Sequence, residues 1–133
     1  MIKNQISLSK NQKIVLDYIQ KIKKPAKAYS ISSGAKKSGI NAPPQVYRAL
    51  DKLIEKGKIH KIESQNSFIA CNIGDCATPH AVAFSICNQC EIVTEINDQK
   101  LFKYLSDFKD KSGVNFKGYN LEFFGVCDSC KAI

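Results

Sequence analysis

Several residue patterns that mark enzymes, membrane proteins and secreted proteins are missing from this sequence. Its 133 residues include two histidines and no tryptophan, and they offer neither a Ser/His/Asp set with histidines to spare nor a glycine-rich phosphate loop. No apolar run approaches the roughly 20 residues of a membrane-spanning helix. The first residues lack the apolar core of a secretion signal. We therefore expect a cytoplasmic protein that is not an enzyme and that uses neither a membrane nor a small-molecule substrate.

Cysteine is well represented, and most of it is paired in the sequence. Four of the six cysteines form two Cys-x2-Cys pairs, Cys87 with Cys90 and Cys127 with Cys130. Two such pairs supply a complete tetrahedral thiolate set for zinc. The 36 residues between the pairs exceed the usual gap of a compact zinc ribbon, so the intervening chain must form structure of its own. The spacing predicts a structural zinc site that acts as a clasp.

Two other uses of these cysteines compete with zinc. A redox-active pair is expected near a βαβ unit with its thiolate at a helix N-terminus, whereas Cys90 is followed by Glu91, Ile92 and Val93, which favour a strand. Structural disulfides are typical of secreted domains, and no secretion signal precedes them. A dithiol oxidoreductase stays open as the alternative, and it predicts activity that survives removal of metal.

The charge of the chain is divided unevenly. Residues 1–70 hold 14 Lys and Arg against 4 Asp and Glu, whereas residues 71–133 hold 6 against 8. The net charge of +10 in the first half suggests a polyanionic partner, because Lys and Arg that neutralise phosphates release counterions. Charge alone is weak evidence, since a basic face also serves solubility. A nucleic-acid partner therefore needs a supporting motif.

Three helices are predicted in the first half. Ser9 and Gln12 form a capping box before an apolar pattern over residues 10–22. A second helix is expected over residues 28–38, with Gly34 costing stability inside it and Gly39 suited to the C-terminal cap. The third begins at the two prolines 43 and 44 and ends at Gly57.

A hairpin is predicted after the third helix, with strands over residues 58–63 and 67–71. Three helices followed by a hairpin is the order of a winged helix, in which the third helix enters the major groove of DNA. Arg48 is the residue expected to recognise a base, since a guanidinium matches guanine O6 and N7. The further candidates for DNA contact are Gln45, Tyr47, Lys36, Lys37, Lys52, Lys58 and Lys61.

The second half is predicted to contain strands around one helix. Residues 80–84 and 85–95 predict an antiparallel pair, and Asn97 or Asp98 is expected to cap a helix that ends near Ser112 and Gly113. Its apolar stripe is predicted to be core. A strand over residues 116–126 then leads to Cys127. Part of the exposed sheet edge is expected to pair with a second copy.

Three segments together resemble the ferric uptake regulator family, specifically its zinc uptake regulator branch. They are residues 43–53, 60–64 and 66–71, and the two Cys-x2-Cys pairs lie where the family has them. The resemblance implies an α+β protein with three parts: a winged-helix DNA-binding domain over residues 1–71, a hinge over 72–79, and a small α/β dimerisation domain over 80–133 that holds the structural zinc.

The resemblance also implies a second, regulatory zinc site in each chain. Its matching ligands are His60, Cys71, His80 and Glu95, and they include both histidines of the protein. Nitrogen, thiolate and carboxylate ligands suit tetrahedral Zn(II). The implied function is a zinc-responsive transcriptional repressor of zinc uptake genes, which binds operator DNA as a homodimer when the regulatory site is loaded.

Some features depart from the family pattern or leave alternatives open. Cys76 is an additional thiol of unassigned role, and Gln45 stands where the branch usually has a smaller hydroxyl residue, which leaves the base preference open. One alternative is a family member that responds to another metal or to redox state. The other is a zinc-stabilised nucleic-acid-binding protein without sensing, in which the four regulatory ligands never meet.

Overall fold

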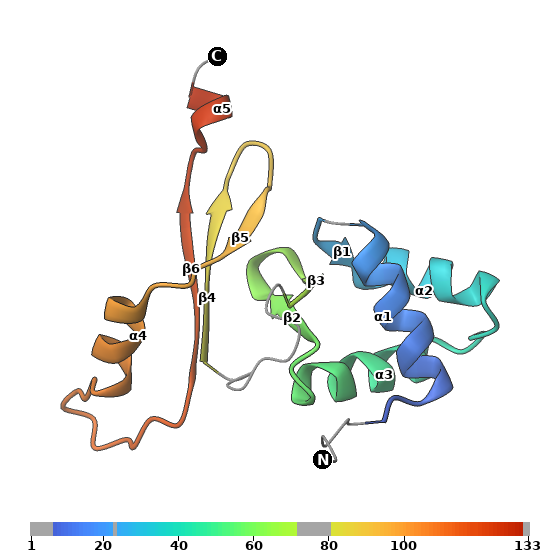
Figure 1. Ribbon diagram of the computed structural model, residues 1–133, viewed down its shortest axis with the longest axis horizontal. Helices are drawn as coiled ribbons and strands as arrows, with labels where there is room; N and C mark the ends of the chain where they lie inside the picture. The colour runs from blue at the N-terminus through green and yellow to red at the C-terminus, as the bar shows by residue number, and fades with distance from the viewer. Residues whose placement is uncertain (1–6, 23, 72–80, 132–133) are drawn as a thin grey trace, which may run out of the picture. The chain divides into compact units, whose positions relative to one another are not determined.

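The computed structural model describes residues 7–22, 24–71 and 81–131. The chain divides into two compact units, residues 1–79 and 80–133. Figure 1 labels the helices and strands. The predicted hinge over residues 72–79 lies outside the described residues, as do Cys76 and His80. No helix in the described ranges has both the length and the apolar character needed to cross a membrane.

Three helices form the body of the first unit, as predicted. They are α1 (Lys10–Ile22), α2 (Ala28–Lys37) and α3 (Pro43–Glu55). The capping box is present, because the Ser9 amide donates to Gln12 Oε1 and the Gln12 amide donates to Ser9 Oγ, both at 3.2 Å. Gly57 follows α3 with φ of 72°, a left-handed conformation that glycine adopts without a steric cost.

The predicted hairpin is part of a three-stranded antiparallel sheet. Strands β2 (Ile59–Ile62) and β3 (Ser67–Ala70) pair as expected, and β1 (Ala26–Lys27) adds to the free edge of β3. Two residues are too short a segment for a sequence pattern to reveal. A 3-10 turn, η1 (Glu63–Gln65), and the left-handed Asn66 connect β2 to β3.

One apolar core holds the three helices against this sheet. Val15, Ile31, Leu53 and Ile59 are completely buried in it. Gly34 has a packing role that its sequence position did not reveal, because a Cβ added there would lie 2.1 Å from the ring of Tyr18. The glycine that was predicted to weaken α2 is also what allows α1 and α2 to approach each other closely.

The second unit contains a mixed three-stranded sheet with β4 in the middle. Strand β4 (Ala81–Cys87) pairs antiparallel with β5 (Val93–Glu95), as predicted, and parallel with β6 (Tyr119–Gly125). Val82, Phe84 and Ile86 of β4 are buried, and Ala83 and Cys87 on the opposite face are buried as well. Strand β6 begins at Tyr119, later than the predicted residue 116.

Two predictions for the helix of this unit were wrong. Asp98 caps α4 (Gln99–Ser106) by accepting from the Leu101 amide at 3.0 Å, as expected, but the helix ends well before Ser112. Asp110 accepts both the amide and the hydroxyl of Ser112, a local turn that competes with helical hydrogen bonding. The apolar stripe is not core within this chain, since no α4 residue is buried and Phe108, beyond its end, is 43% exposed.

Candidate metal centre and nucleic-acid interface

Parallel pairing of β4 and β6 brings the two cysteine pairs together. Parallel strands end at the same edge of a sheet, and here Cys87 at the end of β4 lies opposite Gly125 at the end of β6. A tight turn after β4 presents Cys90. Cys127 follows shortly after β6, and Cys130 lies on the short α5 (Asp128–Lys131). The long interval between the pairs is therefore occupied by β5, α4 and β6.

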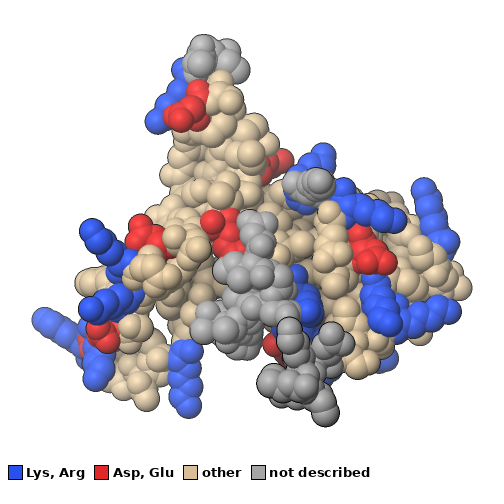
Figure 2. Space-filling model, in the orientation of Figure 1, with Lys and Arg blue, Asp and Glu red and all other residues tan. Residues whose placement is uncertain are grey.

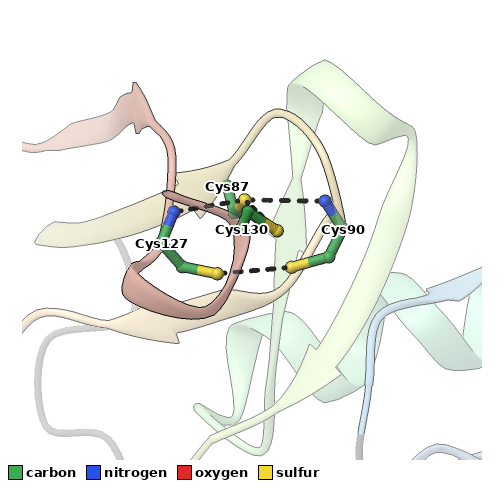
Figure 3. Close-up of side chains that lie close together, drawn as sticks. All are labelled: Cys87, Cys90, Cys127 and Cys130. Atoms are coloured by element: carbon green, nitrogen blue, oxygen red, sulfur yellow. Dashed lines mark hydrogen bonds between the residues drawn. The ribbon is translucent and has the colours of Figure 1, made fainter. Parts of the chain in front are cut away.

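The four sulfur atoms have the spacing of a tetrahedral zinc site. All four lie within 4.8 Å of one another. The sulfurs of Cys87 and Cys130 are 3.7 Å apart, and those of Cys90 and Cys127 are 3.8 Å apart (Figure 3). Zn–S bonds of about 2.3 Å in a tetrahedron require an S···S edge of about 3.8 Å. The separations are far beyond a disulfide bond, so the geometry and the donor chemistry both fit a zinc site with four thiolate ligands.

Backbone amides make the four thiols unequal. The amides of Cys90 and Cys127 donate to Cys87 Sγ at 3.5 and 3.4 Å and lower the pKa of its thiol to about 6. The adjacent Cys127 sulfur, followed by burial, raises the pKa of Cys130 to about 12. For Cys90 the Ile92 amide lowers the pKa, but the Cys87 sulfur and burial outweigh it, so the net shift is upward. Cys87 is therefore the thiolate that the backbone stabilises before any metal binds.

Two of the four predicted regulatory ligands are neighbours in the wing. His60 lies in β2 opposite Ile69 and is 2% exposed. Cys71 follows β3, where its amide donates to the Lys58 carbonyl at 3.0 Å. The ligand atoms of His60 and Cys71 lie within 4.8 Å of each other. His80 lies outside the described residues, and Glu95 ends β5 in the second unit, half-buried.

The predicted DNA-contacting residues of α3 are on its exposed side. Val46, Leu50 and Leu53 face the core, which leaves Gln45, Tyr47, Arg48 and Lys52 exposed on the helix. Tyr47 is 51% exposed. Two of the candidate lysines have nearby carboxylates: Lys52 pairs with Glu55 at 3.4 Å and Lys61 with Glu63 at 3.5 Å. Lys36 and Lys37 are exposed at the end of α2.

Tyr29 is a surface residue that the sequence analysis missed. It lies in the first turn of α2, is 82% exposed, and lines a hollow of about 370 Å³ together with Ser33, Lys36, Asn41 and Tyr47. A signal for this surface was present, because residues 18–50 contain no Asp or Glu. In Figure 2 basic side chains are numerous over the helical unit and acidic ones are few. The stretch of sequence without acidic residues thus includes all of α2 and the start of α3.

The family model for the ferric uptake regulator family matches residues 3–124. The chain belongs to this family. The zinc uptake regulation proteins of Escherichia coli strain K12 and Shigella flexneri are each 38% identical to it over 88 residues, which is 66% of this chain and 51% of theirs. The chain thus spans about half the length of these curated relatives.

Solved structures of family members agree with the fold. The crystal structure of holo XcZur has a TM-score of 0.82 and 34% identity, and the match covers 98% of this chain and 90% of that one. A zinc uptake regulator complexed with zinc and DNA has a TM-score of 0.83 and 29% identity, covering 97% and 86%. The predicted resemblance to the zinc uptake regulator branch is confirmed. So is the predicted α+β fold class, a winged helix followed by an α/β unit whose cysteine cluster fits a structural zinc site.

Proposed function

We propose that this protein is a zinc-responsive transcriptional repressor. It binds operator DNA as a homodimer when its regulatory zinc is loaded, and it controls zinc uptake genes. The observation that carries the proposal is the match, over nearly the whole chain, to a zinc uptake regulator complexed with zinc and DNA. The family is one of regulators, and we assign no enzymatic activity.

Each chain is proposed to hold two zinc ions with different roles. Cys87, Cys90, Cys127 and Cys130 hold the structural ion, whose binding free energy belongs to folding because the unfolded chain has no preformed site. His60, Cys71, His80 and Glu95 hold the regulatory ion. The closeness of the His60 and Cys71 ligand atoms supports this second site. The ligand types suit Zn(II), and one imidazole is already buried in the wing.

The regulatory ion is proposed to act by a population shift. We assign residues 1–71 to the DNA-binding domain, 72–79 to the hinge and 80–133 to the dimerisation domain. Two of the proposed ligands, His60 and Cys71, belong to the DNA-binding domain, and the other two, His80 and Glu95, belong to the dimerisation domain. An ion bound by all four favours the domain orientations in which both α3 helices match successive major grooves. The coupling free energy between two such sites is typically about 1 to 3 kcal/mol. Because the coupling is reciprocal, bound DNA must raise the affinity of the regulatory site for zinc by the same factor by which zinc raises the affinity for DNA.

The proposed DNA interface centres on α3 and extends to α2. Arg48 recognises a guanine, with Tyr47 and Gln45 beside it. Lys36, Lys37 and Lys52 contact phosphates, although Lys52 must exchange its ion pair with Glu55 to do so. The exposure of Tyr29 and the absence of acidic residues between positions 18 and 50 support adding this tyrosine to the interface.

Two observations on the second unit support the homodimer. Exposed aromatic side chains are unusually frequent there: Tyr104, Phe108, Phe116, Phe123 and Phe124. Positive and negative charges also lie in different segments of this unit. Residues 99–118 carry five lysines and two aspartates, whereas residues 80–98 and 119–131 carry five acidic residues and one lysine. Exposed apolar surface on a unit that carries segments of opposite charge fits the same surface of a second copy.

Binding to random-sequence DNA under buffered free zinc tests the function. Sequences selected by the zinc-loaded protein should be near-palindromic, and their affinity should fall at least about tenfold when free zinc is lowered enough to empty only the regulatory site. Affinity that ignores free zinc while the four-cysteine site stays loaded would instead indicate a nucleic-acid-binding protein without sensing. A stronger response to Fe(II) or Mn(II) than to Zn(II) would identify a different metal.

A further inference from the structure

The four cysteines of the metal cluster are held by the protein to different degrees. Cys87 is 4% exposed, and its sulfur accepts amide hydrogens from both Cys90 and Cys127. Figure 3 shows both hydrogen bonds converging on this one sulfur. Cys90 is the exposed member of the set, whereas Cys127 and Cys130 are half-buried. The cluster therefore has one anchored cysteine, Cys87, and one cysteine, Cys90, that is more open to solvent than the other three.

Backbone strain adjoins the exposed ligand. Glu91 directly follows Cys90 and has φ of 65°, in the left-handed region that residues with a Cβ avoid. Hydrogen bonds on both sides enforce this conformation: the Glu91 amide donates to the Cys87 carbonyl at 2.9 Å, and the Cys87 amide donates to the Ile92 carbonyl at 3.0 Å. Opening the turn at Cys90 releases this strain, which no residue near Cys127 or Cys130 shares among the described residues.

We propose that the cluster exchanges its metal through Cys90, with a small thiol such as glutathione as the incoming ligand. The incoming sulfur bonds to zinc, the bond between zinc and Cys90 breaks, and the proton of the incoming thiol passes to the Cys90 sulfur. No electron is transferred, so no oxidant is required. Cys87 leaves last because it is buried, so that solvent and an incoming thiol reach its sulfur least. The proposal rests on the cluster holding zinc and is independent of operator binding.

Pulsed alkylation of the zinc-loaded protein tests the order. Zinc content is measured first, and N-ethylmaleimide is then applied in short pulses before peptide mapping by mass spectrometry. The new carbon–sulfur bond replaces the zinc–sulfur bond, and water protonates the maleimide carbon. Cys90 should be the first of the four to be modified, with zinc release in step with its modification. Earlier modification of Cys127 or Cys130 would overturn the proposal.

A glycine substitution tests the contribution of strain without removing a ligand. Glu91→Gly should slow zinc release to a chromophoric chelator in the presence of glutathione by about fivefold, because the closed turn loses its left-handed penalty. Asn66→Gly is the matched control, since Asn66 has φ of 47° in the wing, where glycine should leave zinc release unchanged. Equal or faster release from Glu91→Gly would contradict the proposal. A purified protein without zinc would overturn both the structural metal assignment and this exchange.

Discussion

At the scale of single residues, Arg48 is the sharpest test of DNA recognition. It is the one arginine of the chain and is exposed on α3 between the buried Val46 and Leu50. A lost bidentate contact to guanine costs about 1 to 3 kcal/mol of discrimination. Arg48→Ala should therefore reduce the preference for selected over random DNA by about tenfold or more, with an unchanged thermal midpoint. The two affinities are compared by fluorescence anisotropy.

Lys52 provides the control for Arg48 on the same helix. Lys52→Ala should lower the affinities for selected and for random DNA by similar factors, because a phosphate contact carries no sequence information directly. If Arg48→Ala also lowered the affinities for both kinds of DNA by the same factor, base recognition by Arg48 would be excluded.

Gly34 makes a second prediction at the residue scale, on stability. An exposed helical glycine replaced by alanine normally gains about 1 kcal/mol. Here the added Cβ would meet the Tyr18 ring at 2.1 Å, so Gly34→Ala should instead destabilise the protein by about 1 to 3 kcal/mol. Urea denaturation of the single variant and of Gly34→Ala with Tyr18→Ala measures this. In the Tyr18→Ala background the same glycine substitution should be neutral or stabilising, and destabilisation there would rule out the clash.

At the scale of secondary structure elements, α4 and the segment after it leave aromatic side chains uncovered within one chain. Phe108 and Phe116 stack with ring centroids 5.9 Å apart, yet each is more than 40% exposed. If a second copy covers them, Phe108→Glu should shift the protein toward monomer in sedimentation velocity, because a carboxylate would be buried without a partner. Tyr29→Glu, an equally drastic change in the first unit, should leave the dimer intact. A fully dimeric Phe108→Glu protein would place the interface elsewhere.

At the scale of the whole molecule, substitutions in the two proposed metal sites should have different effects. His80→Ala is expected to fold as a dimer and keep one zinc ion per chain, because the four-cysteine site is untouched, while its DNA binding becomes weak and insensitive to zinc. Cys127→Ser should instead lose the clasp and unfold at lower temperature. Zinc content, circular dichroism and DNA affinity are measured on both variants. A normal zinc response of His80→Ala would remove His80 from the regulatory site.

The pKa shifts of the cluster predict how structural zinc responds to pH. The raised pKa values of Cys130, about 12, and of Cys90 mean that both thiols carry protons in the metal-free cluster at pH 8. Zinc must displace those protons, so its apparent affinity should increase with pH, and binding should release about two protons or more. Calorimetric titrations in buffers with different ionisation enthalpies measure this release. Heats that are identical in every buffer would contradict it.

Local sequence signals were enough for the parts of this protein that depend on near neighbours. The capping box at Ser9, the α3 boundaries at Pro43 and Gly57, and the wing strands follow from patterns within a few residues, and the structure has them. The clustering of the four cysteines was also predictable, because metal ligation demands a particular set of side chains whatever the path of the chain between them.

The order of the main helices and strands and the identity of the four clustered cysteines could thus be predicted from the amino-acid sequence. Tertiary packing sets how β6 pairs with β4, that β1 joins the wing sheet, that Gly34 accommodates Tyr18, and that the α4 stripe is only half-buried within one chain. These features depend on contacts between residues distant in the chain, for which short-range periodicity holds no information. The differences among the four cysteines also depend on tertiary contacts, since one of the amides that donate to the Cys87 sulfur belongs to Cys127, 40 positions away in the chain.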